Sequence, residues 1–414
     1  MISRRLTLIA SAALALGATT LAHANSGTIK IAFIDPLSGP FAATGANGLA
    51  QFQFYADEIN KAGGVLGKKV EVIGFDNKVS PKESLIQLKN VIGDGIQFVF
   101  QGNSSGVAHA LTDAIAKHNE REPKQRVLFL NYSAVDPALT EEKCNFWHFR
   151  FDAHADMKMA ALTDVIAANK GIKKVYIIGQ DYSFGKAVAE AAVKYLGQKR
   201  PDIKIVGNEL HPIGKVKDFS PYITKIKAAG ADAIITGNWG ADMLGLIKAA
   251  DDAGISTPFF TYYAGGSGIT AAIGKSGVGK VRLVTEGTIN PPKTEEWRQM
   301  VKRFKAKNPK GNVDQSRIST GMFMLANAIK KAGTTDPVKV AMALENMEYT
   351  TPWGDKMTMR GSDHQLQMPL RIEVHSDKNV EFDFDNSGFG LVTETTVPVE
   401  RTTQSTSCKM KRPS

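Results

Sequence analysis

The sequence predicts an α/β protein of two similar lobes, each built around a parallel sheet. Short β-branched and aromatic runs alternate with helical stretches of roughly ten to fifteen residues, a pattern typical of βαβ units. The alternation restarts after Arg150, which indicates two sheets in succession rather than one large sheet. The length of 414 residues fits two or three domains of about 150 residues each.

The first series opens with the strand run "TIKIAFID" and the helical stretch "LAQFQFYADEINKAGG", which ends where Gly63 and Gly64 supply a left-handed cap. Ser80, Pro81 and Glu83 then form a capping box that begins a second helix. The other predicted strands are "KKVEVIGFDN", "IQFVFQG", "RVLFLNYS" and "NFWHFRF", and "SGVAHALTDAIAKHNE" is a helix between "IQFVFQG" and "RVLFLNYS".

The second series predicts the strands "KKVYIIGQD", "IKIVGNEL", "ADAIITGN" and "TPFFTYY", of which "TPFFTYY" is the last. Three helices follow without intervening strands, at "TEEWRQMVKRFKAKNP", "STGMFMLANAIKKAG" and "DPVKVAMALENM". Helices that have no sheet of their own must pack on a lobe that already exists. The final run "RIEVHSDKNVEFDFDNSGFGLVTETTV" is β-rich and patterned like a hairpin.

Residues 1–24 have the features of a secretory signal peptide. Two arginines precede an apolar stretch, and an A-x-A-like site follows it, so we predict cleavage near Ala24. A membrane anchor is the alternative, but the apolar stretch is shorter than the ~20 residues that a span needs. We therefore expect a soluble, exported protein.

The chain is basic, with a formal net charge of +10 that falls to +8 when the two arginines of the leader are removed. The basic residues are spread along exposed-looking helix faces and a short tail, "KMKRP". Aromatic residues do not alternate with them in the way that stacks nucleic acid. We read these charges as a solvated surface and expect no nucleic-acid partner.

Cys144 and Cys408 are the two cysteines of the chain. An even count in an oxidising compartment favours a disulfide, while two unpaired buried thiols remain the alternative. A bridge would close a loop of over 260 residues. The chain-entropy model gives such a loop a stabilisation of ~4–5 kcal/mol.

The segment "GNSSG", from Gly102 to Gly106, matches the G-x-S-x-G pattern of a hydrolase elbow, with Ser104 as the nucleophile. Such an enzyme would supply an acid and then a histidine, and no downstream histidine lies in a suitable Gly-rich loop. The second interpretation makes Ser104 and Ser105 donors at a helix N-terminus that receives a carboxylate. The third is an ordinary N-cap serine.

"GKSGVGKV", from Gly274 to Val281, is close to a phosphate-binding loop. Val281 stands where the Mg²⁺-binding hydroxyl is needed, so we interpret the segment as a plain loop. No Cys, His or carboxylate cluster has metal-ligand spacing, and we predict no metal and no cofactor.

Aromatic residues follow three strands of the second series, at Tyr182, at Trp239, and at Tyr262 with Tyr263. Any one of them could be buried for packing alone. All of them at the same end of a sheet favour an aromatic wall against a small ligand.

Together these segments resemble the type I periplasmic binding proteins, in particular the leucine/isoleucine/valine-binding branch that serves ABC transporters. The resemblance covers nearly the whole mature chain and includes "IAFIDPLSGPFAATG", "FQGNSSGVAHAL", "NYSAVDPALT", "FWHFR", "GQDYSFGK", "DFSPYITKIKAAGADAIITGNWGADM" and "TPWGDKMTMRGSDHQ". It implies two Rossmann-like lobes with the ligand between them, joined by three hinge crossovers near Trp147–Arg150, Val281–Gly287 and Tyr349–Pro352. The first lobe would comprise 25–148 with 284–350, and the second 149–283 with 351–414.

The resemblance also implies a ligand-binding set. Ser104 and Ser105 stand where the family holds the ligand carboxylate. In "NYSA", Ser133 stands where the family places a hydroxyl and backbone donors for the same end of the ligand, and we include its neighbours Tyr132 and Ala134 in the ligand-binding set. Tyr182 and Trp239 fall on positions of the second lobe that close over the ligand, to which we add Tyr262, Tyr263 and Ala264.

Ala264 marks a departure from the family. Amino-acid binders of this branch carry a glutamate there, which pairs with the ligand ammonium, and its loss removes a charge-assisted partner of ~1.5–3 kcal/mol. The sequence therefore also allows an aromatic or aliphatic acid without an amine. Asp181 and Glu286 are the alternatives that could restore the charge.

We expect an exported, monomeric substrate-binding protein without enzymatic activity that captures a small carboxylate by hinge closure and delivers it to an inner-membrane ABC permease from the periplasm. A ligand-sensing module for a receptor or regulator is the first alternative, because closure would be the same. A secreted serine hydrolase is the second.

Overall fold

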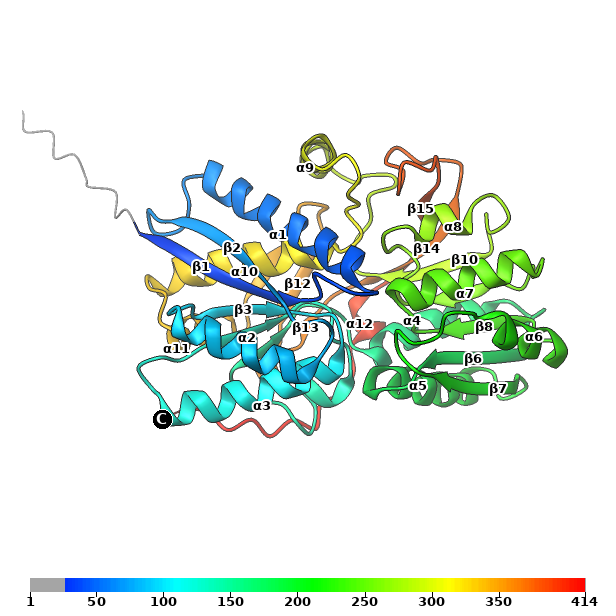
Figure 1. Cartoon of the computed structure of the whole chain (residues 1–414), viewed down its shortest axis with the longest axis horizontal. Coiled ribbons are helices and arrows are strands. Elements are labelled where there is room, and N and C mark those ends of the chain that lie inside the picture. The colour runs from blue at the N-terminus through cyan, green and yellow to red at the C-terminus, as the bar shows by residue number, and fades with distance from the viewer. Residues whose placement is uncertain (1–26, 414) are drawn as a thin grey trace, which may run out of the picture.

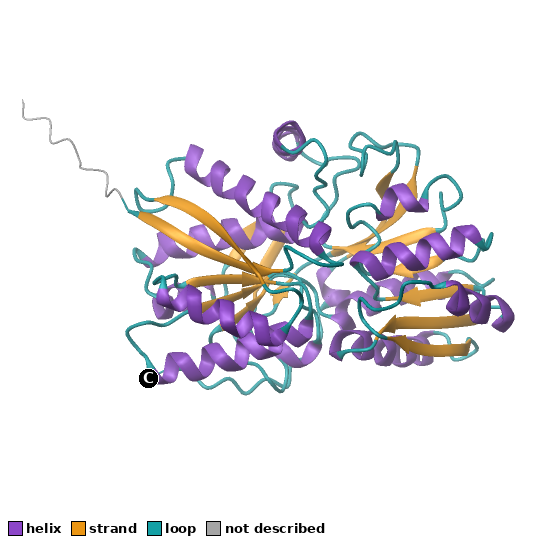
Figure 2. Cartoon of the chain, viewed as in Figure 1, coloured by secondary structure: helices purple, strands orange, loops and turns teal. Residues whose placement is uncertain are grey.

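The computed structural model describes residues 27–413, so the predicted signal peptide and its cleavage site lie outside the described residues. Figures 1 and 2 show two α/β lobes side by side, each with a sheet and helices packed around it. No helix within 27–413 is long and apolar enough to cross a bilayer. The predicted fold class is confirmed.

The first lobe holds a five-stranded sheet in the order β2-β1-β3-β4-β5, and all its neighbouring strands are parallel. Every residue of the short inner strands β3 and β4 is buried, as expected of a parallel sheet covered on both faces. The strands are β1 Thr28–Asp35, β2 Lys69–Asp76, β3 Phe98–Gln101, β4 Leu128–Asn131 and β5 His148–Arg150.

Three helices connect these strands, and three later helices return to the same lobe. Tyr55 of α1 packs edge-on against Phe323 of α10, and Phe54 packs against Phe304 of α9, with centroid distances of 5.8 and 5.4 Å. The returning helices thus find the sheet that they lacked in the sequence. The helices are α1 Ala42–Lys61, α2 Pro81–Gly93, α3 Ser105–Arg121, α9 Glu295–Lys307, α10 Ser316–Ala332 and α11 Pro337–Leu344, with a 3-10 turn at Pro137–Thr140.

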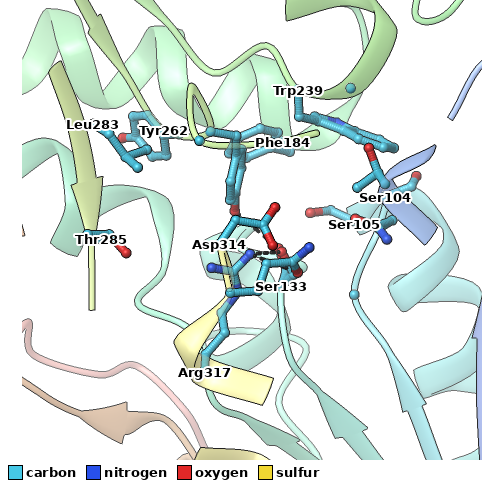
Figure 3. A pocket seen from close by; sticks show the side chains of 18 of the residues that line it. Ser104, Ser105, Ser133, Phe184, Trp239, Tyr262, Leu283, Thr285, Asp314 and Arg317 are labelled. Carbon is cyan, nitrogen blue, oxygen red and sulfur yellow. Dashed lines mark hydrogen bonds between the residues drawn. The ribbon is translucent and has the colours of Figure 1, made fainter. Parts of the chain in front are cut away.

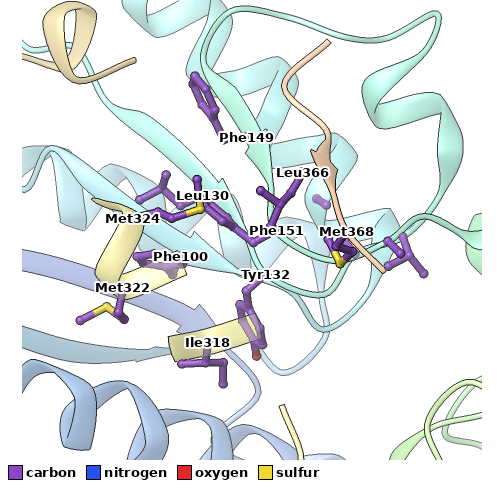
Figure 4. Close-up of a cluster of buried hydrophobic side chains, with 14 of the residues drawn as sticks. Phe100, Leu130, Tyr132, Phe149, Phe151, Ile318, Met322, Met324, Leu366 and Met368 are labelled. Atoms are coloured by element: carbon purple, nitrogen blue, oxygen red, sulfur yellow. The ribbon is translucent and has the colours of Figure 1, made fainter. Parts of the chain in front are cut away.

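The core of the first lobe joins the sheet to α10 and to the hinge region (Figure 4). Side chains from β3 to β5 meet residues of α10 and two residues of the hinge region, Leu366 and Met368. The labelled members are Phe100, Leu130, Tyr132, Phe149, Phe151, Ile318, Met322, Met324, Leu366 and Met368.

The second lobe holds a seven-stranded sheet in the order β15-β14-β10-β9-β8-β6-β7. Five strands are parallel: β6 Lys174–Gln180, β7 Lys204–His211, β8 Ala233–Thr236, β9 Phe259–Thr261 and β10 Val281–Thr285. The hairpin of β14 Leu370–Ser376 and β15 Gly390–Val397 adds antiparallel to β10. The helices are α4 Ala155–Ala168, α5 Ser183–Lys199, α6 Ser220–Ala229, α7 Gly240–Asp252, α8 Ile269–Ile273 and α12 Val399–Thr402.

The sequence prediction missed strand β10. It ended the second sheet at "TPFFTYY" and read Val281–Gly287 as a crossover, whereas Val281–Thr285 pairs with β9 on one side and β14 on the other. The crossover follows this strand. Two residues that had been assigned to the first lobe, Val284 and Thr285, therefore belong to the second sheet.

The hinge region contains a third small sheet, formed by β11 Glu348–Thr350, β12 Lys356–Met359 and β13 Leu366–Gln367. The predicted third crossover at Tyr349–Pro352 lies inside this sheet. The chain enters the second sheet only after β13, at β14.

The C-terminal segment returns from the second lobe to the first. Arg401 donates to Asp164 of α4 at 2.7 Å, whereas Arg412 donates to Glu345, which follows α11, at 2.6 Å. Cys408 forms a disulfide with Cys144, with Cα atoms 5.8 Å apart, and this confirms the predicted bridge. Figure 1 accordingly shows the C-terminus beside the first lobe, although the prediction had placed all of 351–414 in the second.

Candidate ligand-binding site

A cavity of about 610 Å³, measured out to its open mouth, lies between the two lobes (Figure 3). Its lining comes mainly from the loops at the carboxyl ends of parallel strands, where open α/β sheets bind ligands. Seven of the ten predicted binding residues line it: Ser104, Ser105, Ser133, Tyr182, Trp239, Tyr262 and Tyr263.

Ser104 is the residue that precedes α3, and its backbone has a φ of +86°. A serine rarely adopts this conformation, and such strain persists where the surrounding structure holds it in place, often at ligand sites. The Ser104 side chain does not cap the helix. Within residues 27–413 no hydrogen bond uses its hydroxyl, so this group and the first N–H groups of α3 are available to an external acceptor at the positive end of the helix dipole.

The buried carboxyl group of Asp35 holds the loop before α3 in place. It accepts the backbone N–H groups of Gly102 and Asn103 at 3.2 and 3.0 Å and the Tyr132 hydroxyl at 2.6 Å. Burial raises the pKa of Asp35 to about 8, although these hydrogen bonds act in the opposite direction. Tyr132 is fully buried against Phe33 and does not line the cavity, so its place is in the support of the loop.

The predicted backbone donors of "NYSA" are already used. The N–H groups of Ser133 and Ala134 both donate to Asn131 Oδ1, at 3.1 and 2.7 Å, and Ala134 is buried away from the cavity. Ser133 does face the cavity, and its hydroxyl accepts a hydrogen bond from Arg317 Nη2 at 3.0 Å.

The four predicted aromatic residues form one wall of the cavity, and the polar atom of each is hydrogen-bonded within the protein. Trp239 Nε1 donates to the Tyr182 hydroxyl at 2.9 Å, and the Tyr262 hydroxyl donates to the Ala155 carbonyl at 2.8 Å. The Tyr263 hydroxyl donates to the Ser133 carbonyl at 3.2 Å and so joins the lobes. The ring of Phe184, in the first turn of α5, completes this wall. The sequence analysis did not predict this residue.

Ala264 does not line the cavity. Its side chain is fully buried in a hydrophobic cluster of the second lobe that includes Ile269 and Ile273. The adjacent residues Tyr263 and Gly265 do line it. Of the two alternative charges, Asp181 lies on the surface beside Lys186, and Glu286 is paired beneath the cavity.

Arg317 of α10 is the main cation of the site, and sequence reasoning missed it. Its guanidinium approaches Asp152 and Glu286, each at 3.3 Å, and Lys158 pairs with Asp152 at 2.8 Å. Burial by itself would raise the pKa of Glu286, but Arg317 and Lys158 outweigh it and lower that pKa to about 2. The opposed acids raise the pKa of Arg317 against the effect of its own burial. These four charges balance.

Asp314 is the second missed residue, in the loop that leads into α10. Its carboxylate faces the cavity and accepts hydrogen bonds from Asn47 at 2.8 Å and Gln51 at 2.9 Å. Burial raises its pKa to about 7, although Arg317 lowers it. One signal in the sequence was the pair of charges in "DQSRI", placed just before a long apolar helix in which a charge must find partners.

The hydrolase interpretation gains no support from the geometry. Within residues 27–413, no hydrogen bond joins Ser104 to a histidine, and the nearest histidine in sequence, His109, bonds to Asp136 at 2.8 Å. The same residues contain no group of three or more His, Cys, Asp or Glu side chains placed to hold a metal ion.

Two lobes that close on a cavity lined by donors and aromatic rings define the class of bilobed binding proteins. The family model described as "Periplasmic binding protein" matches residues 28–377. The chain belongs to this family.

Relatives and solved structures support this family assignment. The Leu/Ile/Val-binding protein homolog 4 of Brucella abortus is 33% identical over 98% of this chain and 97% of its own length. The crystal structure of the leucine-, isoleucine-, valine-, threonine- and alanine-binding protein from Brucella ovis, in a closed conformation, superposes with a TM-score of 0.82 at 30% identity, over 94% of this chain and all of that one. A benzoate complex of a solute-binding protein from R. palustris shares the fold, with a TM-score of 0.78 at 18% identity over 92% of this chain and 100% of that one.

Proposed function

We propose that this chain is the exported substrate-binding subunit of an ABC importer and that it encloses a small carboxylate between its lobes. The observation that carries the proposal is the strained Ser104 turn at the N-terminus of α3, which faces the cavity together with Ser105. Backbone N–H groups and hydroxyls at a helix N-terminus are the donor set that a carboxylate needs.

The relatives support the same class of ligand. Their names refer to branched-chain amino acids, each of which has a carboxylate and an apolar side chain. Here the carboxylate would meet the first lobe, and the apolar part would meet Tyr182, Phe184 and Trp239 of the second.

Delivery to a membrane permease from the periplasm, as a monomer, completes the proposal. It rests on the family and on the signal-like leader in the sequence. The same closure would serve a sensory partner equally well. Transport and sensing would therefore differ in the partner protein that binds the closed state, not in the ligand site.

The test is Ser104→Ala, with Ser220→Ala as the control, since Ser220 occupies the first turn of α6 outside the cavity. L-leucine, isocaproate and benzoate are the probes, and binding raises the melting temperature by mass action. We expect Ser104→Ala to weaken binding about 10-fold, as loss of a hydrogen bond to a charged group does, and Ser220→Ala to leave it unchanged. Failure of every acid to stabilise the wild type would overturn the proposal, as would ester hydrolysis that Ser104→Ala abolishes.

A further inference from the structure

Asp314 is an acidic group on the cavity wall, and within residues 27–413 no cation is bonded to it. Asn47 Nδ2 and Gln51 Nε2 both donate to its Oδ1 atom, and no hydrogen bond within residues 27–413 reaches its Oδ2 atom. The ion pairs of the same residues do not include Asp314. Figure 3 shows its carboxylate among the side chains that line the cavity.

The other charges of the site are already neutralised. Arg317 and Lys158 face Asp152 and Glu286 at 2.8 to 3.3 Å, so two positive charges meet two negative charges. Asp314 is then the surplus charge of the cavity. Asp314 is partly buried, and an acid on a largely enclosed cavity wall without a bonded counter-charge loses hydration that a ligand cation would offset.

The carboxylate of Asp314 is held in place by neutral groups. Asn47 also donates to the Asn312 carbonyl at 3.0 Å and accepts the Asn312 N–H at 3.0 Å, so α1 clamps the loop that carries Asp314. Amide donors fix the direction of the carboxylate and leave its charge available. This arrangement suits a recognition group because it is oriented before a ligand arrives.

We infer that Asp314 pairs with a protonated amine of the ligand, and that the site therefore selects amino acids over the corresponding acids without an amine. The inference rests on the proposed function, because it assigns the ligand carboxylate to the Ser104 turn. Both charged ends of the ligand would then be held by the first lobe. Asp314 would supply from the first lobe the negative charge that neither Ala264, Asp181 nor Glu286 offers to a ligand in the cavity.

The pKa of Asp314 gives the inference a second signature. Burial raises this pKa to about 7, and the other charges that act on it are Arg317, which lowers it, and Asp385, which raises it. An ammonium group favours the ionised form, so ligand binding near pH 7 would release part of a proton. Affinity for an amino acid should therefore fall as the pH drops below about 7.

The experiment compares matched ligands on the full-length mature protein. Isothermal titration calorimetry would measure L-leucine against isocaproate, L-valine against isovalerate and L-phenylalanine against hydrocinnamate, since each pair differs only in the amine. The variant is Asp314→Asn, which keeps the shape and the acceptor for Asn47 and Gln51. The wild type is also titrated from pH 6 to pH 8, in buffers of different ionisation enthalpy.

We expect the wild type to prefer the amino acid of at least one pair by about 10- to 100-fold, which is the range for a charge-assisted contact. Asp314→Asn should remove that preference, leave binding of the acid without an amine within about twofold, and abolish proton release. Equal binding of both members of every pair would overturn the inference while leaving carboxylate capture intact. An unchanged preference in Asp314→Asn would overturn it as well. Absence of binding by all six compounds and by benzoate would overturn both proposals.

Discussion

The rings of Phe41 and Trp239, one from each lobe, lie with their centroids 4.2 Å apart. Phe41 precedes α1, and Trp239 precedes α7 and lines the cavity. The Phe41 ring fits where two glycines of the second lobe leave room, because a Cβ atom on Gly214 or Gly240 would lie 2.7 or 2.6 Å from it. Phe41 of the first lobe therefore packs directly against the second lobe at the rim of the cavity.

Gly240→Ala should therefore hinder closure. The added methyl group would collide with Phe41, and the backbone φ of +56° would strain any alanine. Gly254→Ala is a matched control, because its φ is +62° and nothing lies within 4 Å of its Cβ position. We expect Gly240→Ala to weaken ligand affinity about 10-fold or more, and Gly254→Ala to lower only the stability, by roughly 1 kcal/mol. Calorimetry and thermal melting would measure both effects, and equal affinities for the two variants would contradict the role of the Phe41 contact.

Glu286 should make the stability of the protein dependent on pH in the acidic range. Its folded pKa of about 2 lies below the ordinary value of 4.5, because Arg317 and Lys158 outweigh its burial. A lowered pKa stabilises the fold above the unfolded value and loses that contribution as the pH falls toward the folded one. The stabilisation is about 3 kcal/mol for a shift of this size.

Glu286→Gln is the variant that tests this expectation, and the exposed Glu400→Gln is its control. Urea unfolding at pH 7 and at pH 3 would measure the free energy of unfolding. The difference between wild type and Glu286→Gln should be large at pH 7 and smaller at pH 3. A difference that stays constant would show that Glu286 acts by packing alone.

Cys408→Ser should destabilise the protein without affecting the ligand. The disulfide joins residues 264 positions apart, and the chain-entropy model gives such a loop about 5 kcal/mol. Neither cysteine lines the cavity, so the affinity should not change. Denaturant unfolding and calorimetry would separate the two quantities, with the double variant Cys144→Ser/Cys408→Ser to exclude effects of a free thiol. A loss of affinity in both variants would show that the tail takes part in closure.

Much of the fold could be predicted because the hydrophobic runs and caps are local signals. Strand β10 escaped because "VRLVT" is short, follows a glycine-rich loop and carries a charged residue, Arg282. Its strand identity depends on pairing with β9 and β14, and β14 lies almost 90 residues further along the chain.

Only part of the site could be predicted, because the side chains that reach the cavity also depend on contacts that are distant in sequence. The chain bends directly after β4, and there Ser133 faces the cavity while its neighbours Tyr132 and Ala134 are buried in the core. A motif shows where such a segment lies in the sequence, but not which of its side chains face the cavity. Asp314 and Arg317 reach the cavity because α10 returns to the first lobe; the resemblance implied that return, but not which side chains of the segment would face the cavity.

The bond between Cys144 and Cys408 makes a covalent ring of the intervening backbone. All strands of the second sheet, from Lys174 to Val397, lie within this ring, as do the connections between the lobes. A protease that cuts the chain once, at any point of the ring, therefore leaves a single molecule whose halves remain linked. For a protein in an exposed compartment, such tolerance of a first cut would preserve the pair of lobes as a unit until a reductant or a second cut separates them.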